Sequence, residues 1–167
     1  MKKSSKIFVA GHNGMVGSAI CRTLYSNGYK NIIKKPKEEL DLTIQADVFQ
    51  FLNKEKPEAV INAAAKVGGI LANKNFPYEF IMQNMLIQNN LIDCSYKIGV
   101  KQFVFLGSSC IYPKLAPQPL KEEYLLTSSL EPTNDYYAIA KISGLKACQA
   151  IKKQYGAVDY CCREASG

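Results

Sequence analysis

The sequence "NDYYAIAKISG", residues 134–144, places two tyrosines four and five positions ahead of a lysine. Residues four apart share one face of a helix, so we expect Tyr137 and Lys141 to lie side by side while Tyr136 turns away. A free tyrosine has a pKa near 10, too high for ready proton exchange at neutral pH. A fixed ammonium a few ångströms away, with a cationic cofactor ring nearby, favours the phenolate and lowers that pKa. The pair is therefore a candidate acid and base for a carbonyl group.

A serine hydroxyl that holds the carbonyl oxygen would complete such a site. The stretch "FVFLGSSCIYP" offers Ser108 and Ser109 directly after residues 102–107, which have the composition of a strand. In open α/β sheets, ligands bind outside the carboxyl ends of the strands, so both serines are well placed. A tyrosine and a lysine at this spacing are frequent by chance, and it is the added serine and the glycines below that favour catalysis.

Gly11, Gly14 and Gly17 stand three apart in "AGHNGMVGS", between a first apolar run and an apolar helix. Glycine permits a tight turn, lets the backbone approach a pyrophosphate and lets helix and strand pack closely. The N-terminus of the helix then faces the anion. This placement predicts a dinucleotide-binding turn, with a plain glycine-rich turn as the alternative.

The sequence "KKPK", residues 34–37, follows the second predicted strand, where NAD-binding domains usually present an acidic residue to the ribose. Lysines here would neutralise an adenosine 2′-phosphate, so the sequence favours NADP(H) over NAD(H). A solvated charge run is the alternative. Asp41 and Leu42 follow, and the carboxylate would contact the adenine or cap the next helix.

Alternating strands and helices would bring these residues to one edge of a sheet. Short β-branched and aromatic runs predict strands at 7–10, 31–33, 59–63, 102–107 and 158–162. Segments of helical period predict helices at 15–26, 43–54, 78–97 and 136–155. The alternation indicates an α/β fold, a doubly wound parallel sheet (Rossmann fold) over residues 1–160. The irregular stretch 111–135 is a candidate site loop.

Composition excludes several other classes of protein. The 167 residues are 47% apolar and 21% charged, which predicts a globular chain with a real core. No apolar run suffices for a signal peptide or a membrane span, so we expect a cytoplasmic protein without a membrane partner. The six cysteines have no zinc-binding spacing, which predicts free thiols and no metal. The net charge of +7 is scattered, so no nucleic-acid partner is expected.

In order along the chain, "GHNGMVG", "NAAAKVGG", "SSCIYP" and "YAIAK" resemble the extended branch of the short-chain dehydrogenase/reductase family. Within that branch, "FLGSSCIYPKLAPQPLKEEYL" and "EPTNDYYAIAKISG" are similar to the GDP-L-fucose synthases, and the similarity covers residues 6–160. It implies that GDP-4-keto-6-deoxy-D-mannose is epimerised at C3 and C5. Reduction at C4 by NADPH then gives GDP-L-fucose.

The resemblance implies a role for each matching residue. Tyr137 is the proton donor in reduction, and Lys141 lowers its pKa and holds the nicotinamide ribose. Ser108 binds the C4 oxygen, and Cys110 is an acid/base group of epimerisation, with a small buried filler as the alternative. Hydrogens beside a ketone are acidic because the enolate spreads charge onto oxygen, which Ser108 and Tyr137 would stabilise. The residues expected to contact NADP(H) are Gly11, His12, Asn13, Gly14, Met15, Val16, Gly17, Lys35, Lys37, Asp41, Leu42, Ala63, Ala64, Ala65, Leu106, Gly107, Ser108, Ser109, Tyr137 and Lys141.

Two further regions have family counterparts. By resemblance, "AAAKVGGI", residues 63–70, lines the site between cofactor and sugar, although its two glycines also suit an ordinary bend. The helices 78–97 and 136–155 look like those that pair across a twofold axis, which implies a homodimer. Four apolar side chains suit that interface and a monomer core alike: Met82, Met85, Leu86 and Ile92.

One departure from the family concerns the 2′-phosphate. Asn13 stands where these synthases often carry arginine. Lys35 and Lys37 would then have to provide more of the phosphate contact, and the preference for NADP(H) depends on them.

The C-terminus departs further. After "QYGAVDY" the family continues with an apolar strand, a Pro-Thr-Asn segment, a histidine acid/base and a nucleotide-sugar domain, whereas this chain reads "CCREASG". Arg163 and Glu164 fall where a buried strand would finish, which is costly unless they reach solvent. We therefore expect residues 161–167 to be an aberrant or truncated tail, and this chain alone to be catalytically impaired.

Two other functions stay open at this point. One is another nucleotide-sugar epimerase, dehydratase or reductase of the same branch, against which Cys110 and "AAAKVGG" argue. The other is a non-catalytic NADP-binding module, which the abrupt C-terminus favours.

Overall fold

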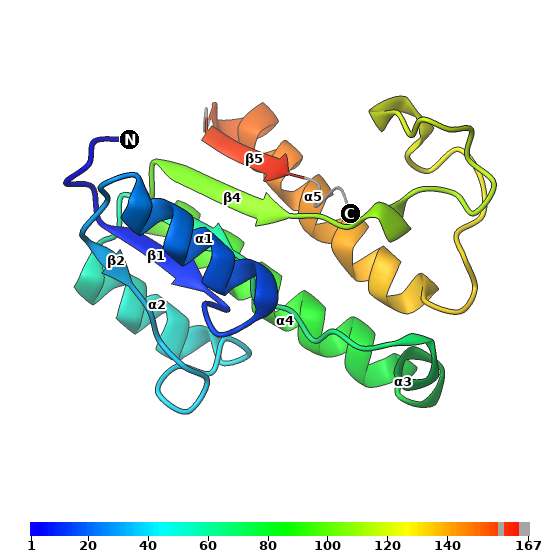
Figure 1. Ribbon diagram of the computed structural model, residues 1–167, viewed down its shortest axis with the longest axis horizontal. Coiled ribbons are helices and arrows are strands. Elements are labelled where there is room, and N and C mark those ends of the chain that lie inside the picture. The colour runs from blue at the N-terminus through cyan, green and yellow to red at the C-terminus, as the bar shows by residue number, and fades with distance from the viewer. Residues whose placement is uncertain (157–158, 164–167) are drawn as a thin grey trace.

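The computed structural model describes residues 1–156 and 159–163, and these form a parallel five-stranded sheet covered by helices (Figure 1). The strand order is β2-β1-β3-β4-β5. The bounds are β1 Ile7–Ala10, β2 Ile32–Ile33, β3 Ala59–Asn62, β4 Gln102–Leu106 and β5 Asp159–Arg163. The order changes direction between β1 and β3, which is the kind of switch point at which α/β sheets bind ligands.

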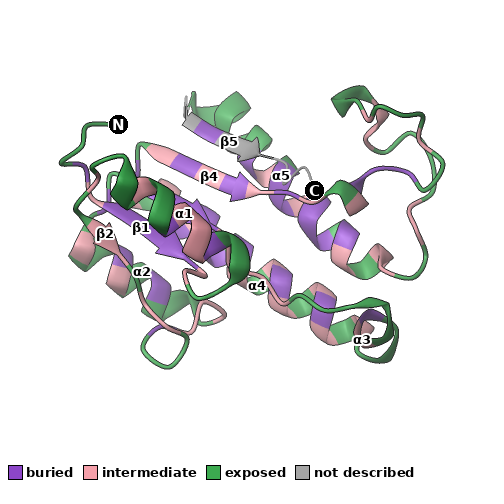
Figure 2. Ribbon diagram, viewed as in Figure 1, coloured by how far each residue is buried: buried purple, intermediate pink, exposed green. Residues whose placement is uncertain are grey.

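Helices cover both faces of the sheet, which confirms the predicted doubly wound architecture. They are α1 Met15–Ser26, α2 Gln45–Glu55, α3 Ile70–Asn75, α4 Pro77–Lys97 and α5 Asp135–Tyr155, with 3-10 turns η1 Ser109–Ile111 and η2 Glu122–Tyr124. Phe8 and Ala10 share a core with α2, α4 and α5, whereas Ile7 and Val9 pack with α1. All four residues of β1 and of β3 are buried, as Figure 2 shows for β1. Because both faces of these strands are covered, they are nearly continuous apolar runs in the sequence.

The predicted strands and helices are present, with ends shifted by at most two residues. α2 begins at Gln45 because the preceding residues close a turn, in which the N–H and hydroxyl of Thr43 donate to Asp41 Oδ1 at 2.9 and 2.7 Å. Sequence reasoning missed α3, whose six residues are too few to show a helical period.

The predicted site loop, residues 111–135, is anchored to α5. Ile111 and Tyr112 pack against Ile142 and Leu145, and further apolar loop residues surround this small cluster. The loop therefore lies beside the helix that carries the tyrosine and the lysine.

At the C-terminal end, β5 pairs with β4 through Arg163, whose backbone lies opposite Leu106. Residues 161–163, expected to belong to an aberrant tail, thus have strand backbone. The first residue of the predicted strand, Val158, and residues 164–167 lie outside the described residues. The domain boundary at residue 160 stays a prediction.

The described part of the chain offers neither a membrane span nor a metal centre. None of its helices combines the length and the apolar composition needed to cross a bilayer. No three side chains of His, Cys, Asp or Glu gather there closely enough to hold a metal ion. Free thiols are confirmed at the cysteines whose surroundings are described: Cys21, Cys94, Cys110 and Cys148.

Candidate active site

Three glycines shape the turn from β1 into α1, each for a different steric reason. Gly11 has φ +78°, and a Cβ there would lie 2.6 Å from the backbone nitrogen of Ala64. A Cβ on Gly17 would lie 2.1 Å from the carbonyl oxygen of Gly11, so the helix and the turn are in backbone contact. Gly14 is exposed, and a Cβ there would meet only that oxygen, at 3.4 Å. No described neighbour requires glycine at position 14, and its bare backbone leaves room for a ligand to approach.

The N-terminus of α1 opens beside this turn and has no acidic side chain in its first turn. The first N–H groups of a helix have no partner within the helix, and the helix dipole adds positive potential there. Met15 and Val16 are exposed at this end despite their apolar side chains. The arrangement fits an anion such as a pyrophosphate.

A cavity of about 640 Å³ lies against the turn. Its walls come from the ends of β1, β2 and β3 and from one side of α4. The predicted cofactor residues that line it are Gly11, His12, Asn13, Gly14, Met15, Val16, Lys35, Lys37, Asp41, Leu42, Ala63, Ala64 and Ala65. Lys66 and Val67 also line it and belong to the segment 63–70 that was expected to line the site. The lining residues that sequence reasoning did not name as contacts are Pro36, Glu38, Leu40, Thr43, Gln83 and Ile87.

His12 brings a polar atom to the cavity wall. Its buried Nδ1 atom has no hydrogen-bond partner among the described residues. Burial, and then the charge of Lys34, lower the pKa of the imidazole, so the ring is neutral at pH 7. A neutral imidazole offers one donor and one acceptor, so the unpartnered nitrogen fits a polar ligand in the cavity.

Two of the three lysines that follow β2 line the cavity. Lys35 and Lys37 line the cavity, whereas Lys34 is exposed, with its ammonium 5.6 Å from the centre of the Tyr25 ring. Lys35 forms an ion pair with Glu39. Because both side chains of that pair remain largely accessible to water, the pair is weak and can rearrange around a phosphate.

Asp41 lines the cavity and closes the turn that leads into α2. Hydrogen bonds from the hydroxyl and then the backbone N–H of Thr43 lower the pKa of its carboxyl group, and the charge of Lys37 adds to this. The N-cap of α2 is Ile44, so Asp41 caps the turn and not the helix itself. Its contact with adenine stays a prediction.

The residues predicted to be catalytic meet where β4 ends against α5. Tyr137 and Lys141 share a face of α5, with the ammonium 5.8 Å from the centre of the tyrosine ring, whereas Tyr136 is 47% exposed. Lys141 is buried, and its ammonium donates to the carbonyl oxygen of Leu106 at 2.9 Å. The four-residue spacing thus places both groups at the end of β4, as expected.

The Ser108 side chain is hydrogen-bonded to both Cys110 and Tyr137. The thiol of Cys110 donates to Ser108 Oγ at 3.2 Å, and the Ser108 side chain hydrogen-bonds the Tyr137 hydroxyl. Burial raises the pKa of the Cys110 thiol, which the hydrogen bond with Ser108 and the charge of Lys141 partly offset. The thiol is therefore protonated at neutral pH, with a single hydroxyl between it and the tyrosine.

The predicted lowering of the tyrosine pKa needs a cationic cofactor ring as well as the Lys141 ammonium, so it stays a prediction. The protein groups alone shift that pKa upwards. Burial raises the pKa of Tyr137 to about 12, and the negative charge that Cys110 carries once its thiol ionises at high pH adds to the rise. The hydrogen bond with Ser108 offsets only part of it. The Lys141 ammonium, hydrogen-bonded to the Leu106 carbonyl, does not reverse it. Tyr137 therefore keeps its proton at neutral pH.

Close packing of α5 against α4 and β4 determines where Lys141 lies. Gln88 of α4 donates to the carbonyl oxygen of Ala140 at 2.6 Å. A Cβ on Gly144 would lie 2.6 Å from the Phe105 ring and 2.9 Å from Gln88. Only glycine therefore lets α5 lie this close to β4, and Lys141 stands one helical turn before it.

The cavity and the candidate catalytic group (Ser108, Cys110, Tyr137 and Lys141) follow one another along the carboxyl edge of the sheet, in the order β2, β1, β3 and β4. A dinucleotide with its phosphates at α1 would extend along this edge towards β4. Gly17 packs within the turn, and Ser109 is exposed at the start of η1. The other predicted cofactor residues outside the cavity lie at β4 and α5: Leu106, Gly107, Ser108, Tyr137 and Lys141.

The chain belongs to the NAD dependent epimerase/dehydratase family, whose model matches residues 7–165. It is 61% identical over 154 residues to GDP-L-fucose synthase 1 of Arabidopsis thaliana, a match that covers 92% of this chain and 48% of the relative. The GDP-L-fucose synthase of Sinorhizobium fredii is 60% identical over 152 residues, covering 91% and 48%. The predicted resemblance is thus confirmed, and the chain spans about half the length of the curated relatives it matches.

A solved structure agrees with the fold over the same portion. MlghC, a GDP-mannoheptose C4 reductase from Campylobacter jejuni with NADP bound, is similar at a TM-score of 0.90 and 42% sequence identity. The match covers 93% of this chain and 46% of the reductase.

Proposed function

We propose that this chain is the cofactor-binding part of an NADPH-dependent GDP-L-fucose synthase, which converts GDP-4-keto-6-deoxy-D-mannose to GDP-L-fucose. The observation that carries the proposal is the meeting of Ser108, Cys110, Tyr137 and Lys141 beyond a cavity that begins at the N-terminus of α1. The substrate is supported by relatives named GDP-L-fucose synthase at 61% and 60% identity. The NADP bound to the Campylobacter reductase supports the cofactor.

The cavity residues fit this cofactor. When bound, NADPH supplies a hydride to C4 of the sugar. The α1 N-terminus and the bare backbone of Gly14 would hold the pyrophosphate, because both face the open side of the turn. Lys35 and Lys37 would hold the 2′-phosphate, and His12 has a ring nitrogen to offer to a polar group.

Two residues of the candidate catalytic group, Tyr137 and Cys110, would donate the protons. Tyr137 holds its proton at neutral pH and gives it to the C4 oxygen, and the Ser108 hydroxyl donates to the same oxygen. The Lys141 ammonium, on the same face of α5, stabilises the phenolate that remains. For epimerisation, a base outside these four residues would remove the proton beside the ketone, and Ser108 and Tyr137 would stabilise the enolate oxygen. Cys110 would then give its proton to that carbon from the opposite face.

A reductase for another GDP-sugar is the second candidate, which the similarity to the Campylobacter C4 reductase favours. Reduction alone needs the serine, tyrosine and lysine, whereas epimerisation also needs an acid/base group beside C3 and C5. Cys110 is half-buried and hydrogen-bonded to Ser108, which is a suitable position for that group. It therefore favours the epimerase and reductase over a simple reductase or a non-catalytic module.

We further propose that two copies pair through α4 and α5, in the cytoplasm. Tyr78, Met82 and Leu86 stand four residues apart on α4 and are exposed, and Ile139 is exposed on α5. A helix with an apolar stripe on its outer face favours a helical partner. Ile92, weighed as a candidate for the same interface, is instead buried in the monomer core.

A titration tests the cofactor assignment directly. NADPH and NADH are each titrated into the folded chain, with binding followed by calorimetry and folding by circular dichroism. We expect one site per chain and a Kd about tenfold lower for NADPH, because only NADPH carries the phosphate that the lysines attract. A folded chain that binds neither dinucleotide would remove the basis of the proposal. We also expect this chain alone to form no GDP-L-fucose.

A further inference from the structure

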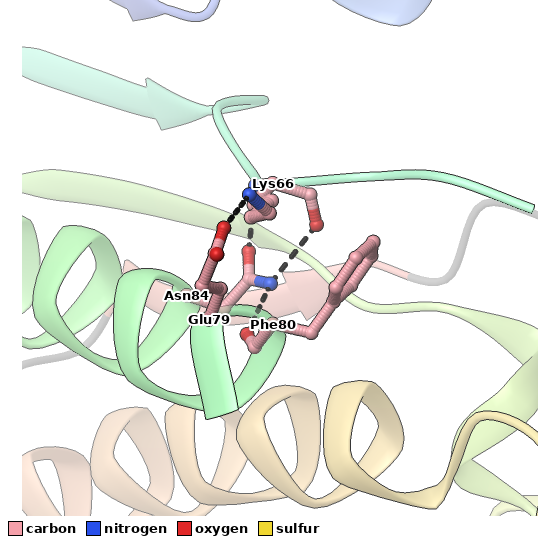
Figure 3. Close-up of polar contacts among 4 residues, drawn as sticks. All are labelled: Lys66, Glu79, Phe80 and Asn84. Carbon is pink, nitrogen blue, oxygen red and sulfur yellow. Dashed lines mark hydrogen bonds and ion pairs between the residues drawn. The ribbon is translucent and has the colours of Figure 1, made fainter. Parts of the chain in front are cut away.

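The side-chain amide of Asn84, on α4, forms hydrogen bonds with the backbone of Lys66 (Figure 3), a residue that lines the cavity. Its Oδ1 accepts from the backbone N–H of Lys66 at 2.9 Å, and its Nδ2 donates to the carbonyl oxygen of Lys66 at 2.9 Å. Nδ2 also donates to the carbonyl oxygen of Phe80, at 2.7 Å. With only 2% of its surface exposed, Asn84 forms these bonds away from water, where they are strong and where their loss is costly.

The residues that Asn84 holds have no helix or strand of their own. Residues 63–69 connect β3 to α3 and lack regular structure, so their polar backbone groups need other partners. Two more buried asparagines help at the ends of the segment. Asn62 Oδ1 accepts from the N–H of Ala64 at 3.0 Å, and Asn73 donates to two carbonyl oxygens, those of Gly68 and Gly69.

Asn84 alone holds the middle of the segment in this way, among the side-chain bonds of the described residues. The Lys66 side chain also pairs with Glu79, at 2.6 Å. That ion pair is partly exposed and therefore screened by water, whereas the asparagine bonds are buried. The order of the segment thus depends more on Asn84 than on Glu79.

The same segment is the wall on which the glycine turn packs. Residues 63–67 line the cavity, and the missing Cβ of Gly11 is what lets the turn lie against the backbone of Ala64. If residues 63–69 moved, the cavity would change shape beyond the carboxyl ends of β1 and β3. A preformed wall lowers the ordering cost of binding.

We infer that Asn84 is a positioning residue for the dinucleotide: it fixes residues 63–69 so that the cavity is formed before NADPH enters. The inference rests on the proposed function, because NADPH is the ligand. Asn84 itself does not line the cavity, so its effect passes through Lys66. An amide suits the task because it offers an acceptor and two donors at one site.

The test compares Asn84→Leu with Leu91→Val, a variant of another buried residue on α4 that has no polar contact with the segment. We measure NADPH affinity by calorimetry and the hydrogen exchange of individual amides by NMR. In Asn84→Leu we expect the Kd for NADPH to rise about tenfold and exchange at the Lys66 amide to accelerate at least as much. In Leu91→Val the Tm should fall while Kd and Lys66 exchange stay at wild-type values.

Asn84→Asp is measured alongside, in case the leucine variant does not fold. Aspartate keeps the oxygen that accepts from the Lys66 amide but loses both donated bonds, so that amide should stay protected while the Kd for NADPH still rises. Wild-type affinity in either folded variant overturns the inference and leaves the proposed function standing. A wild-type chain that binds no NADPH overturns both.

Discussion

Alanine should have different effects at two glycines of the first turn, lowering stability at Gly17 and NADPH affinity at Gly14. Gly17→Ala tests the packing of the helix against the turn. The new methyl would lie 2.1 Å from the carbonyl oxygen of Gly11, where ordinary contact begins at 3.4 Å. Overpacking of this kind costs about 3 kcal/mol. The better helix propensity of alanine offsets about 1 kcal/mol of that. A net loss of about 2 kcal/mol lowers the Tm of a chain of this size by roughly 4–8 °C.

Gly14→Ala should spare the fold and damage binding. At Gly14 the methyl has room, and φ −72° with ψ 166° is open to alanine, so we expect a Tm within about 2 °C of wild type. The methyl would occupy the space through which the pyrophosphate reaches the backbone. The Kd for NADPH should therefore rise about 10- to 100-fold, or roughly 1.4–2.8 kcal/mol.

Differential scanning fluorimetry and calorimetric titration of both variants provide the assay. Unchanged NADPH affinity in Gly14→Ala would show that the pyrophosphate does not lie on this turn. Unchanged Tm in Gly17→Ala would refute the backbone contact with Gly11.

Three other changes give further tests. Lys37→Ala should raise the Kd for NADPH several-fold and leave that for NADH unchanged, because only NADPH has a 2′-phosphate; an equal change for both would argue for a solvated charge run. Tyr137→Phe should leave NADPH affinity nearly intact. Since the folded pKa of Tyr137 is raised to about 12 from an ordinary value near 10, its contribution to stability is complete below about pH 10 and lost as the pH rises towards 12. Urea unfolding between those pH values should show a smaller loss of stability in the phenylalanine variant, and identical profiles would contradict the raised pKa. Leu86→Lys should shift a dimer to monomer in light scattering, whereas a wild-type chain that is already monomeric contradicts the pairing through α4 and α5.

Local sequence patterns predicted the parts of the site that depend on spacing. Tyr137 and Lys141 share a helix face because four residues make about one turn, and Ser108 follows a strand whose apolar run ends where the sheet ends. The glycines of the first turn were predictable from their spacing after the first apolar run, although the contact that requires glycine at position 11 is with Ala64, which is distant in the sequence. The raised pKa of Tyr137 was not predictable from spacing, because it depends on burial in the assembled fold and on Cys110, which stands on η1.

Side chains that act across the fold gave no signal in the sequence. Gln83 and Ile87 line the cavity only because α4 packs beside the ends of the strands. Asn84 is one of several asparagines on that helix, and its partner, the backbone of Lys66, lies 18 residues away along the chain. Such pairings become visible only when the sheet order brings the segment after β3 against α4.

A crystal structure of this chain with NADP+ would test the central claim most directly. We expect the pyrophosphate at the N-terminus of α1 beside Gly14, the 2′-phosphate near Lys35 and Lys37, and the nicotinamide end towards Tyr137. A dinucleotide found elsewhere, or one whose nicotinamide points away from the end of β4, would contradict the assignment of both the cavity and the catalytic group.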